Sequence, residues 1–141
     1  MTTPPASVLF VCVHNSGKSQ IAAAIARHEF PDVRVTSAGT APSETVHRGS
    51  AETLAEVGID ITGEQPKAVS DALVADADLV VVLGTEAQVI TSDGTPVVRW
   101  EVDEPSTRGI EGPERMRLVR EDITSRVRTL LTEGPRHETS R

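Results

Sequence analysis

The sequence predicts an α/β fold with a doubly wound parallel sheet of four strands. Two observations lead to this prediction. Strongly apolar runs at 7–13 and 78–84 are bounded by turn residues, as expected of strands buried on both faces of a parallel sheet. Segments with apolar residues at three- and four-residue steps alternate with the strands, as expected of helices that cover such a sheet.

The elements follow one another in a regular order. Pro31 ends the first helix, Gly58 caps the second, and Pro113 begins the last. The expected strands are 7–13, 33–37, 78–84 and 96–100, and the expected helices are about 21–30, 51–57, 71–75 and 113–133. The 141 residues suit one domain, which we expect over 1–133, followed by a flexible tail at 134–141.

Composition excludes several classes of function. The chain carries 14 Lys and Arg against 21 Asp and Glu, a net charge of −7, and its basic residues are scattered. This balance argues against nucleic acid or an acidic membrane as the main partner. No stretch approaches the roughly 18 apolar residues that span a bilayer, and the first ten residues lack the features of a signal peptide. We therefore expect a cytoplasmic protein.

The chain has a single cysteine, Cys12. One cysteine excludes an internal disulfide and a Cys-rich zinc site, and no metal site is predicted. Cys12 is then either a small buried residue at the end of a strand or a reactive thiol.

The segment FVCVHNSGKS at 10–19 is close to two phosphate-binding loops. It fits the nucleotide-binding pattern G-x-x-x-x-G-K-[ST], except that Cys12 replaces the first glycine. It also fits the phosphatase pattern C-x-x-x-x-x-R-S, except that Lys18 replaces the arginine. A nucleotide loop needs that glycine, and usually a later strand that ends in an acid for magnesium, whereas the strand at 78–84 is followed by Thr85.

A cysteine-based loop needs a thiolate at a helix N-terminus, a ring of backbone N–H groups and a cation. Cys12 supplies the thiol, Lys18 the charge, and Ser19 a hydroxyl at the start of the helix. The candidate oxyanion-binding residues are Val13, His14, Asn15, Ser16, Gly17, Lys18 and Ser19.

With these motifs the chain resembles the low-molecular-weight tyrosine phosphatase superfamily, and within it the arsenate reductases. The opening VLFVCVHNSGKSQIAAA, the S-A-G-T segment at 37–40, LAEVGIDI followed by Lys67, and WEVDEP before the last helix carry the resemblance. It implies that Cys12 attacks phosphorus or arsenic, Asn15 braces the loop, and Ser19 donates to the thiolate. The family's general acid precedes a proline, so Asp103 and Glu104 are both candidates, and Lys18 stands in the arginine's place.

The missing second cysteine defines the expected chemistry. Thioredoxin-coupled arsenate reductases carry two more cysteines, so the resemblance implies the single-cysteine type of arsenate reductase, which depends on a small thiol. We expect no bound cofactor, an external thiol such as mycothiol or glutathione, and a glutaredoxin- or mycoredoxin-like partner. The polar run at 106–108, where phosphatases of the family present aromatic residues, favours a small oxyanion such as arsenate or phosphate. A low-molecular-weight protein or aryl phosphatase, a non-catalytic oxyanion-binding module and a nucleotide-binding protein remain alternatives.

Other polar residues have simpler expected roles. His14 is expected to be a loop side chain with a polar contact rather than a catalytic base, and His28 and His47 to lie at the surface. Trp100 is expected to pack in the core. The arginines of the last helix are expected to form its exposed face, paired with Glu121 and Asp122; they are Arg115, Arg117, Arg120, Arg126 and Arg128.

Overall fold

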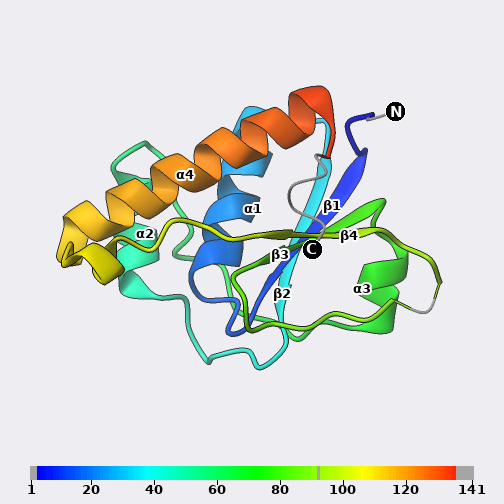
Figure 1. The fold of residues 1–141 in the computed structure, drawn as a ribbon, viewed down its shortest axis with the longest axis horizontal. Coiled ribbons are helices and arrows are strands. Elements are labelled where there is room, and N and C mark those ends of the chain that lie inside the picture. Colours follow the sequence, from blue (N-terminus) through cyan, green and yellow to red (C-terminus); the bar gives the residue numbers. More distant parts are fainter. Residues whose placement is uncertain (1–2, 92, 136–141) are drawn as a thin grey trace.

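The computed structural model describes residues 3–91 and 93–135, and in these residues four parallel strands form one sheet in the order β2-β1-β3-β4 (Figure 1). The strands are β1 (Ser7–Cys12), β2 (Arg34–Gly39), β3 (Leu79–Leu83) and β4 (Val97–Trp100). The predicted fold class is confirmed. The tail predicted at 134–141 lies mostly outside the described residues.

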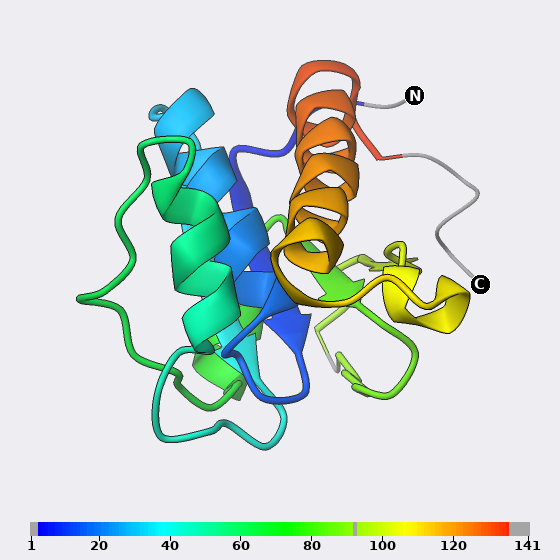
Figure 2. The same ribbon diagram turned by 90° about the vertical axis from the view of Figure 1, so that its left-hand side faces the viewer.

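Helices cover both faces of the sheet. The helices α1 (Lys18–Glu29), α2 (Arg48–Ala55) and α4 (Gly112–Glu133) pack together on one face, and the short α3 (Asp71–Ala75) covers the other (Figures 1 and 2). Alternate strand residues face the two layers: Phe10 and Val81 belong to the core under α1 and α4, whereas Leu9 and Val80 belong to the core under α3. Strands buried on both faces explain the continuous apolar runs.

The order in which successive strands are added to the sheet reverses at β1. It passes from β1 to β2 on one side and then returns to β3 on the other side. In open α/β sheets such a switch point leaves a crevice beyond the carboxyl ends of the strands. The segment that leaves β1 at this point is the loop at 13–17.

Element boundaries differ from the predictions at helix starts. The helix α1 begins at Lys18, one residue before the Ser19 that the loop pattern placed at its start, whereas α2 begins at Arg48, about one turn earlier than the apolar spacing indicates. A short 3-10 helix, η1 (Pro105–Arg108), is an element that the sequence pattern did not predict. Gly58 takes a φ of 83° after the end of α2, as its predicted capping role requires. Trp100 is buried against Phe10, with ring centroids 5.9 Å apart, so its packing role is confirmed.

Among the described residues, every helix is too short or too polar to cross a membrane.

Gly39 brings the end of β2 against the loop at 13–17. It pairs with Cys12 across the two strands, and its own N–H donates to the Lys67 carbonyl. A Cβ atom at this position would lie 2.6 Å from the Val13 carbonyl oxygen and 2.9 Å from the Asn15 nitrogen. Backbone atoms cannot move away as a flexible side chain can, so the S-A-G-T segment needs glycine here.

We therefore expect Gly39→Ala to lower the free energy of unfolding by about 2–3 kcal/mol, because the added methyl overlaps backbone of the loop. Urea denaturation measures the effect. Gly63→Ala is the matched control, since a Cβ at Gly63 meets nothing within 4 Å. Equal free energies of unfolding for the two variants would show that the loop backbone shifts at little cost to accommodate the added methyl.

Candidate active site

The loop at 13–17 joins the carboxyl end of β1 to the N-terminus of α1. Cys12 is the last residue of β1 and Lys18 the first of α1, so the thiol lies where the helix dipole favours a negative charge. Gly17 precedes the helix without a capping side chain. The first N–H groups of α1 are thus available to a ligand rather than to a cap.

Asn15 is the brace of the loop, in agreement with the role that the resemblance implies. It is fully buried and takes a left-handed φ of 51°, a conformation that asparagine tolerates better than most residues. Its Oδ1 accepts from the Lys67 N–H at 3.0 Å, and its backbone carbonyl accepts from Gln20 Nε2 at 3.0 Å. Gln20 is a part of the site that the sequence did not reveal, whereas Lys67, which carries part of the resemblance, contributes its backbone N–H.

A directed chain of hydrogen bonds ends on the cysteine sulfur. Asn15 Nδ2 donates to Ser19 Oγ at 2.7 Å, and Ser19 Oγ lies 3.0 Å from Cys12 Sγ. Because the Ser19 hydroxyl oxygen accepts the hydrogen bond from Asn15, the single hydroxyl hydrogen of Ser19 is free to point at the sulfur. The Asn15 N–H donates to the same sulfur at 3.2 Å. Both contacts stabilise a thiolate more than a thiol.

The thiol opens into a cavity of about 360 Å³ at the carboxyl edge of the sheet. The predicted oxyanion-binding residues divide into two groups. Val13, His14, Ser16, Gly17 and Lys18 line the cavity, whereas Asn15 and Ser19 are fully buried and support the loop. The opposite walls come from the segment after β3, from the start of α2 and from α4, including Thr85, Ser50 and Arg115.

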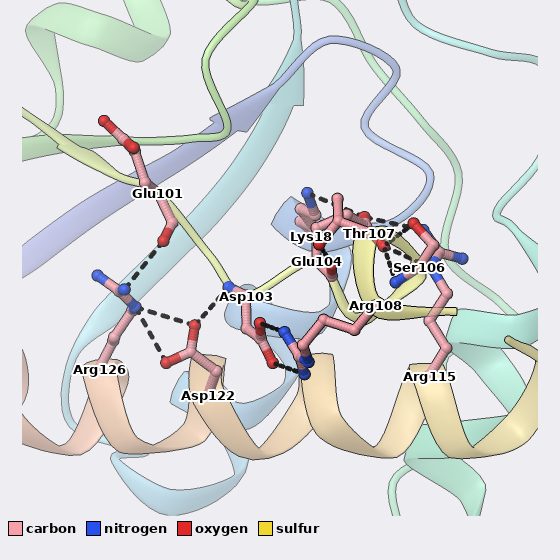
Figure 3. A network of polar contacts seen from close by, with 10 residues as sticks. All are labelled: Lys18, Glu101, Asp103, Glu104, Ser106, Thr107, Arg108, Arg115, Asp122 and Arg126. Carbon is pink, nitrogen blue, oxygen red and sulfur yellow. Dashed lines mark hydrogen bonds and ion pairs between the residues drawn. The ribbon is translucent and has the colours of Figure 1, made fainter. Parts of the chain in front are cut away.

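Glu104 lies between the two cations of the site. Arg115 binds its carboxylate with two hydrogen bonds, from Nε at 2.7 Å and from Nη2 at 3.0 Å, and Lys18 Nζ lies 3.8 Å from Oε1. Figure 3 shows Arg115 extending from α4 to Glu104. The hydrogen bond from Arg115 is the main cause that lowers the pKa of Glu104 to about 2. Glu104 is therefore ionised at neutral pH and must leave Arg115 before it can carry a proton.

Asp103 faces a different direction from Glu104. Its carboxylate binds Arg108 through contacts of 2.8 and 3.2 Å, as Figure 3 shows. These hydrogen bonds hold the pKa of Asp103 below its usual range. Neither acid is among the described residues that line the cavity, but Glu104 contacts Lys18 and Arg115, which do line it. Of the two candidate acids, the structure brings Glu104 to the loop.

The expectation for the arginines of α4 was wrong in part. Arg126 pairs with Asp122 and Arg120 with Glu121, as predicted. Arg120 is nevertheless buried and also donates to the Thr53 carbonyl, while the other partners lie on other elements. These remaining ion pairs are Arg115–Glu104, Arg117–Glu56, Arg120–Glu56 and Arg128–Glu29.

The histidines follow the predictions with one addition. His14 Nδ1 contacts the Ala41 carbonyl at 3.0 Å, which is the polar loop contact expected, and His28 is exposed. His47 is exposed as predicted, but it also lines the cavity of Cys12. Within residues 3–91 and 93–135, no group of three His, Cys, Asp or Glu side chains is arranged to hold a metal ion.

Ser19→Ala is expected to slow alkylation of Cys12 by iodoacetamide at pH 7 about five- to tenfold, because one charge-assisted hydrogen bond to the thiolate is lost. Mass spectrometry of the labelled protein over time gives the rate. Ser106→Ala is a suitable control, since its hydroxyl contacts Glu104 and not the sulfur. An unchanged rate in Ser19→Ala would mean that the hydroxyl does not stabilise the thiolate.

Glu104→Gln is expected to lower the free energy of unfolding by about 1 kcal/mol at pH 7, less than the pKa shift alone implies, because solvent screens a side chain that is 31% exposed. The folded pKa lies below the ordinary value of 4.5. The contribution is therefore complete above pH 4.5 and is lost as the pH falls toward 2. Urea denaturation at pH 7 and at successively lower pH should show the two proteins converging; a constant difference would exclude this ion pair as its source.

Comparisons with known proteins agree with this geometry. Residues 7–139 match the family model described as low molecular weight phosphotyrosine protein phosphatase. An arsenate reductase of Bacillus anthracis is 32% identical over 132 residues, which are 91% of this chain and 96% of that protein.

Two solved structures are also similar. A thioredoxin-dependent arsenate reductase of Corynebacterium glutamicum superposes with a TM-score of 0.74 at 32% identity, over 92% of this chain and 62% of that one, so this chain spans less than two thirds of its length. An arsenate reductase in the phosphate binding state gives a TM-score of 0.77 at 29% identity, over 92% and 98% of the two chains. Because the chain is a member of a family of enzymes, it is itself an enzyme, and it belongs to the low molecular weight phosphotyrosine protein phosphatase family.

Proposed function

We propose that this protein is an arsenate reductase in which the Cys12 thiolate attacks arsenate and a small external thiol completes the reduction. The observation that carries the proposal is the position of Cys12 Sγ. It accepts hydrogen bonds at the mouth of the loop and opens into a cavity lined by two cations, Lys18 and Arg115. The similarity to arsenate reductases at about 30% identity supports arsenic over phosphorus as the atom attacked.

In the first step the oxyanion binds against the loop N–H groups. Cys12 Sγ attacks arsenic, one arsenate hydroxyl leaves as water, and a thiol–arsenate adduct forms. Glu104 is ionised in this arrangement, so the proton for the departing oxygen comes from the substrate or from solvent. The arsenic is still in its pentavalent state after this step.

In the second step an external thiolate attacks Cys12 Sγ. The bond between sulfur and arsenic breaks with its electron pair on arsenic, which becomes trivalent and leaves as arsenite. The two sulfurs are left as a mixed disulfide, which a redoxin then reduces. The chain has no second cysteine to play this part, so we propose glutathione or mycothiol as the thiol and a glutaredoxin- or mycoredoxin-like protein as the reductant. Such thiols are kept reduced in the cytoplasm, where we place the reaction.

The phosphatase alternative is less well supported by the contacts of the two acids. Hydrolysis of a phosphate ester needs a proton on the leaving oxygen. Glu104 and Asp103 are both held as carboxylates by arginines, Arg115 and Arg108. Reduction of arsenate makes less demand on a general acid, because its leaving group can be protonated by the substrate itself.

We expect the protein to reduce arsenate when glutathione or mycothiol is supplied with its redoxin and reductase, and not with thioredoxin and thioredoxin reductase. The reason is that thioredoxin needs a protein disulfide that one cysteine cannot form. NADPH consumption in each reconstituted system measures turnover, with Cys12→Ser as the blank.

The outcomes separate the candidate functions. Turnover with thioredoxin alone, as the name of the corynebacterial relative would suggest, would contradict the proposed thiol requirement. Hydrolysis of an aryl phosphate that depends on Cys12, without arsenate reduction, identifies a phosphatase. Protection of Cys12 by phosphate without either reaction identifies an oxyanion-binding module.

A further inference from the structure

The loop lacks one component of an oxyanion site, a planar guanidinium. Lys18 presents a single ammonium, which acts as a point charge and cannot hold two oxygens of one anion in a fixed geometry. Its Nζ also lies 3.8 Å from the Glu104 carboxylate, which offsets part of its charge. Among the described residues that line the cavity, the other cationic side chain is Arg115.

Arg115 has one edge bound and another unused. Its Nε and Nη2 bind Glu104 at 2.7 and 3.0 Å, and this two-point contact fixes the plane of the guanidinium. Its Nη1 makes a contact of 3.8 Å with Met116 Sδ, a weak acceptor, and no oxygen acceptor for Nη1 occurs in the part of the chain that the structure describes. Met116 and Arg115 both line the cavity of Cys12. A half-buried guanidinium at the wall of the site therefore keeps one donor, Nη1, without an oxygen acceptor among the described residues.

We propose that Arg115 completes the oxyanion site from α4, binding the anion through Nη1 while Glu104 holds the guanidinium in position. This proposal rests on the oxyanion-binding part of the proposed function and not on the thiol chemistry. Arg115 thereby supplies a donor held in a fixed plane, which the flexible ammonium of Lys18 cannot. Glu104 is a positioning residue, since it acts on the anion through Arg115 and Lys18.

The charges of the cluster agree with this assignment. Lys18 and Arg115 together carry two positive charges and Glu104 one negative charge, so the cluster is positive by one before an anion enters. Glu86 lines the cavity as well, near the carboxyl end of β3. The group formed by Lys18, Arg115 and Glu104 therefore keeps a net positive charge that favours an entering anion.

The test is the affinity for inorganic phosphate and arsenate, measured as protection of Cys12 from iodoacetamide. Arg115→Lys keeps the charge and can keep one contact with Glu104, but it removes the planar guanidinium. We expect the phosphate concentration for half-protection to rise roughly tenfold, the equivalent of one charge-assisted hydrogen bond. Arg128→Lys is the matched control, because Arg128 binds Glu29 with the same two-point geometry on the same helix but outside the cavity.

A swap of the two cations separates binding from a merely structural role. The double variant Lys18→Arg with Arg115→Lys places a guanidinium in the loop. Most of the phosphate affinity lost in Arg115→Lys should then be recovered. An altered helix α4 would not be repaired by a change at residue 18. Labelling is carried out below the thermal unfolding midpoint of each variant.

Two results would overturn the proposal: phosphate affinity in Arg115→Lys equal to that of the Arg128→Lys control, or a double variant no better than Arg115→Lys alone. Neither depends on turnover. If phosphate protection follows the expected pattern while no thiol system yields arsenite, the proposed arsenate reduction fails and the role of Arg115 stands. If arsenate is reduced while Arg115→Lys binds phosphate normally, the proposed role of Arg115 fails and the proposed arsenate reduction stands.

Discussion

The buried side chain of Asn15 is the constraint on which the site depends. A left-handed residue in a loop costs free energy, on the order of 1 kcal/mol or more, and must be held by its surroundings. Here the amide of Asn15 joins the Lys67 backbone to the Ser19 hydroxyl, and Gln20 holds its carbonyl. Bending the backbone at Asn15 turns its N–H toward Cys12 Sγ. The strain of one residue is thus the means by which the loop wraps its sulfur.

The sheet supplies the second half of this constraint. Because Gly39 has no side chain, the end of β2 can lie directly against the backbone of Val13 and Asn15. The Gly39 carbonyl accepts from the Val69 N–H, which ties the segment containing Lys67 to the same strand. The loop is therefore enclosed by backbone from two directions, in addition to the side-chain contacts of Asn15 and Gln20.

The sequence predicted those features that local patterns encode. Continuous apolar runs predicted the buried strands, and the spacing of Cys12, Lys18 and Ser19 predicted the loop. The start of α2 was missed because its first turn carries polar residues, such as Ser50, that line the site and break the apolar period. The partner of Arg115 lies eleven residues away on another element, so the charge pattern of α4 pointed to nearer acids. Pairing across elements is set by the tertiary fold, which no window of sequence contains.

The brace between Asn15 and Lys67 also has a consequence for the order of events during synthesis. Its two residues are separated by 52 positions along the chain, and β1 is paired on one side with β3, which is made later still. A nascent chain that has only just exposed Cys12 therefore carries an ordinary thiol on an unsupported strand. The contacts that stabilise a negative charge on the sulfur depend on residues that emerge afterwards, and closing them is a non-local event of the kind that slows folding. Chemical reactivity at Cys12 is in this sense a report of completed folding.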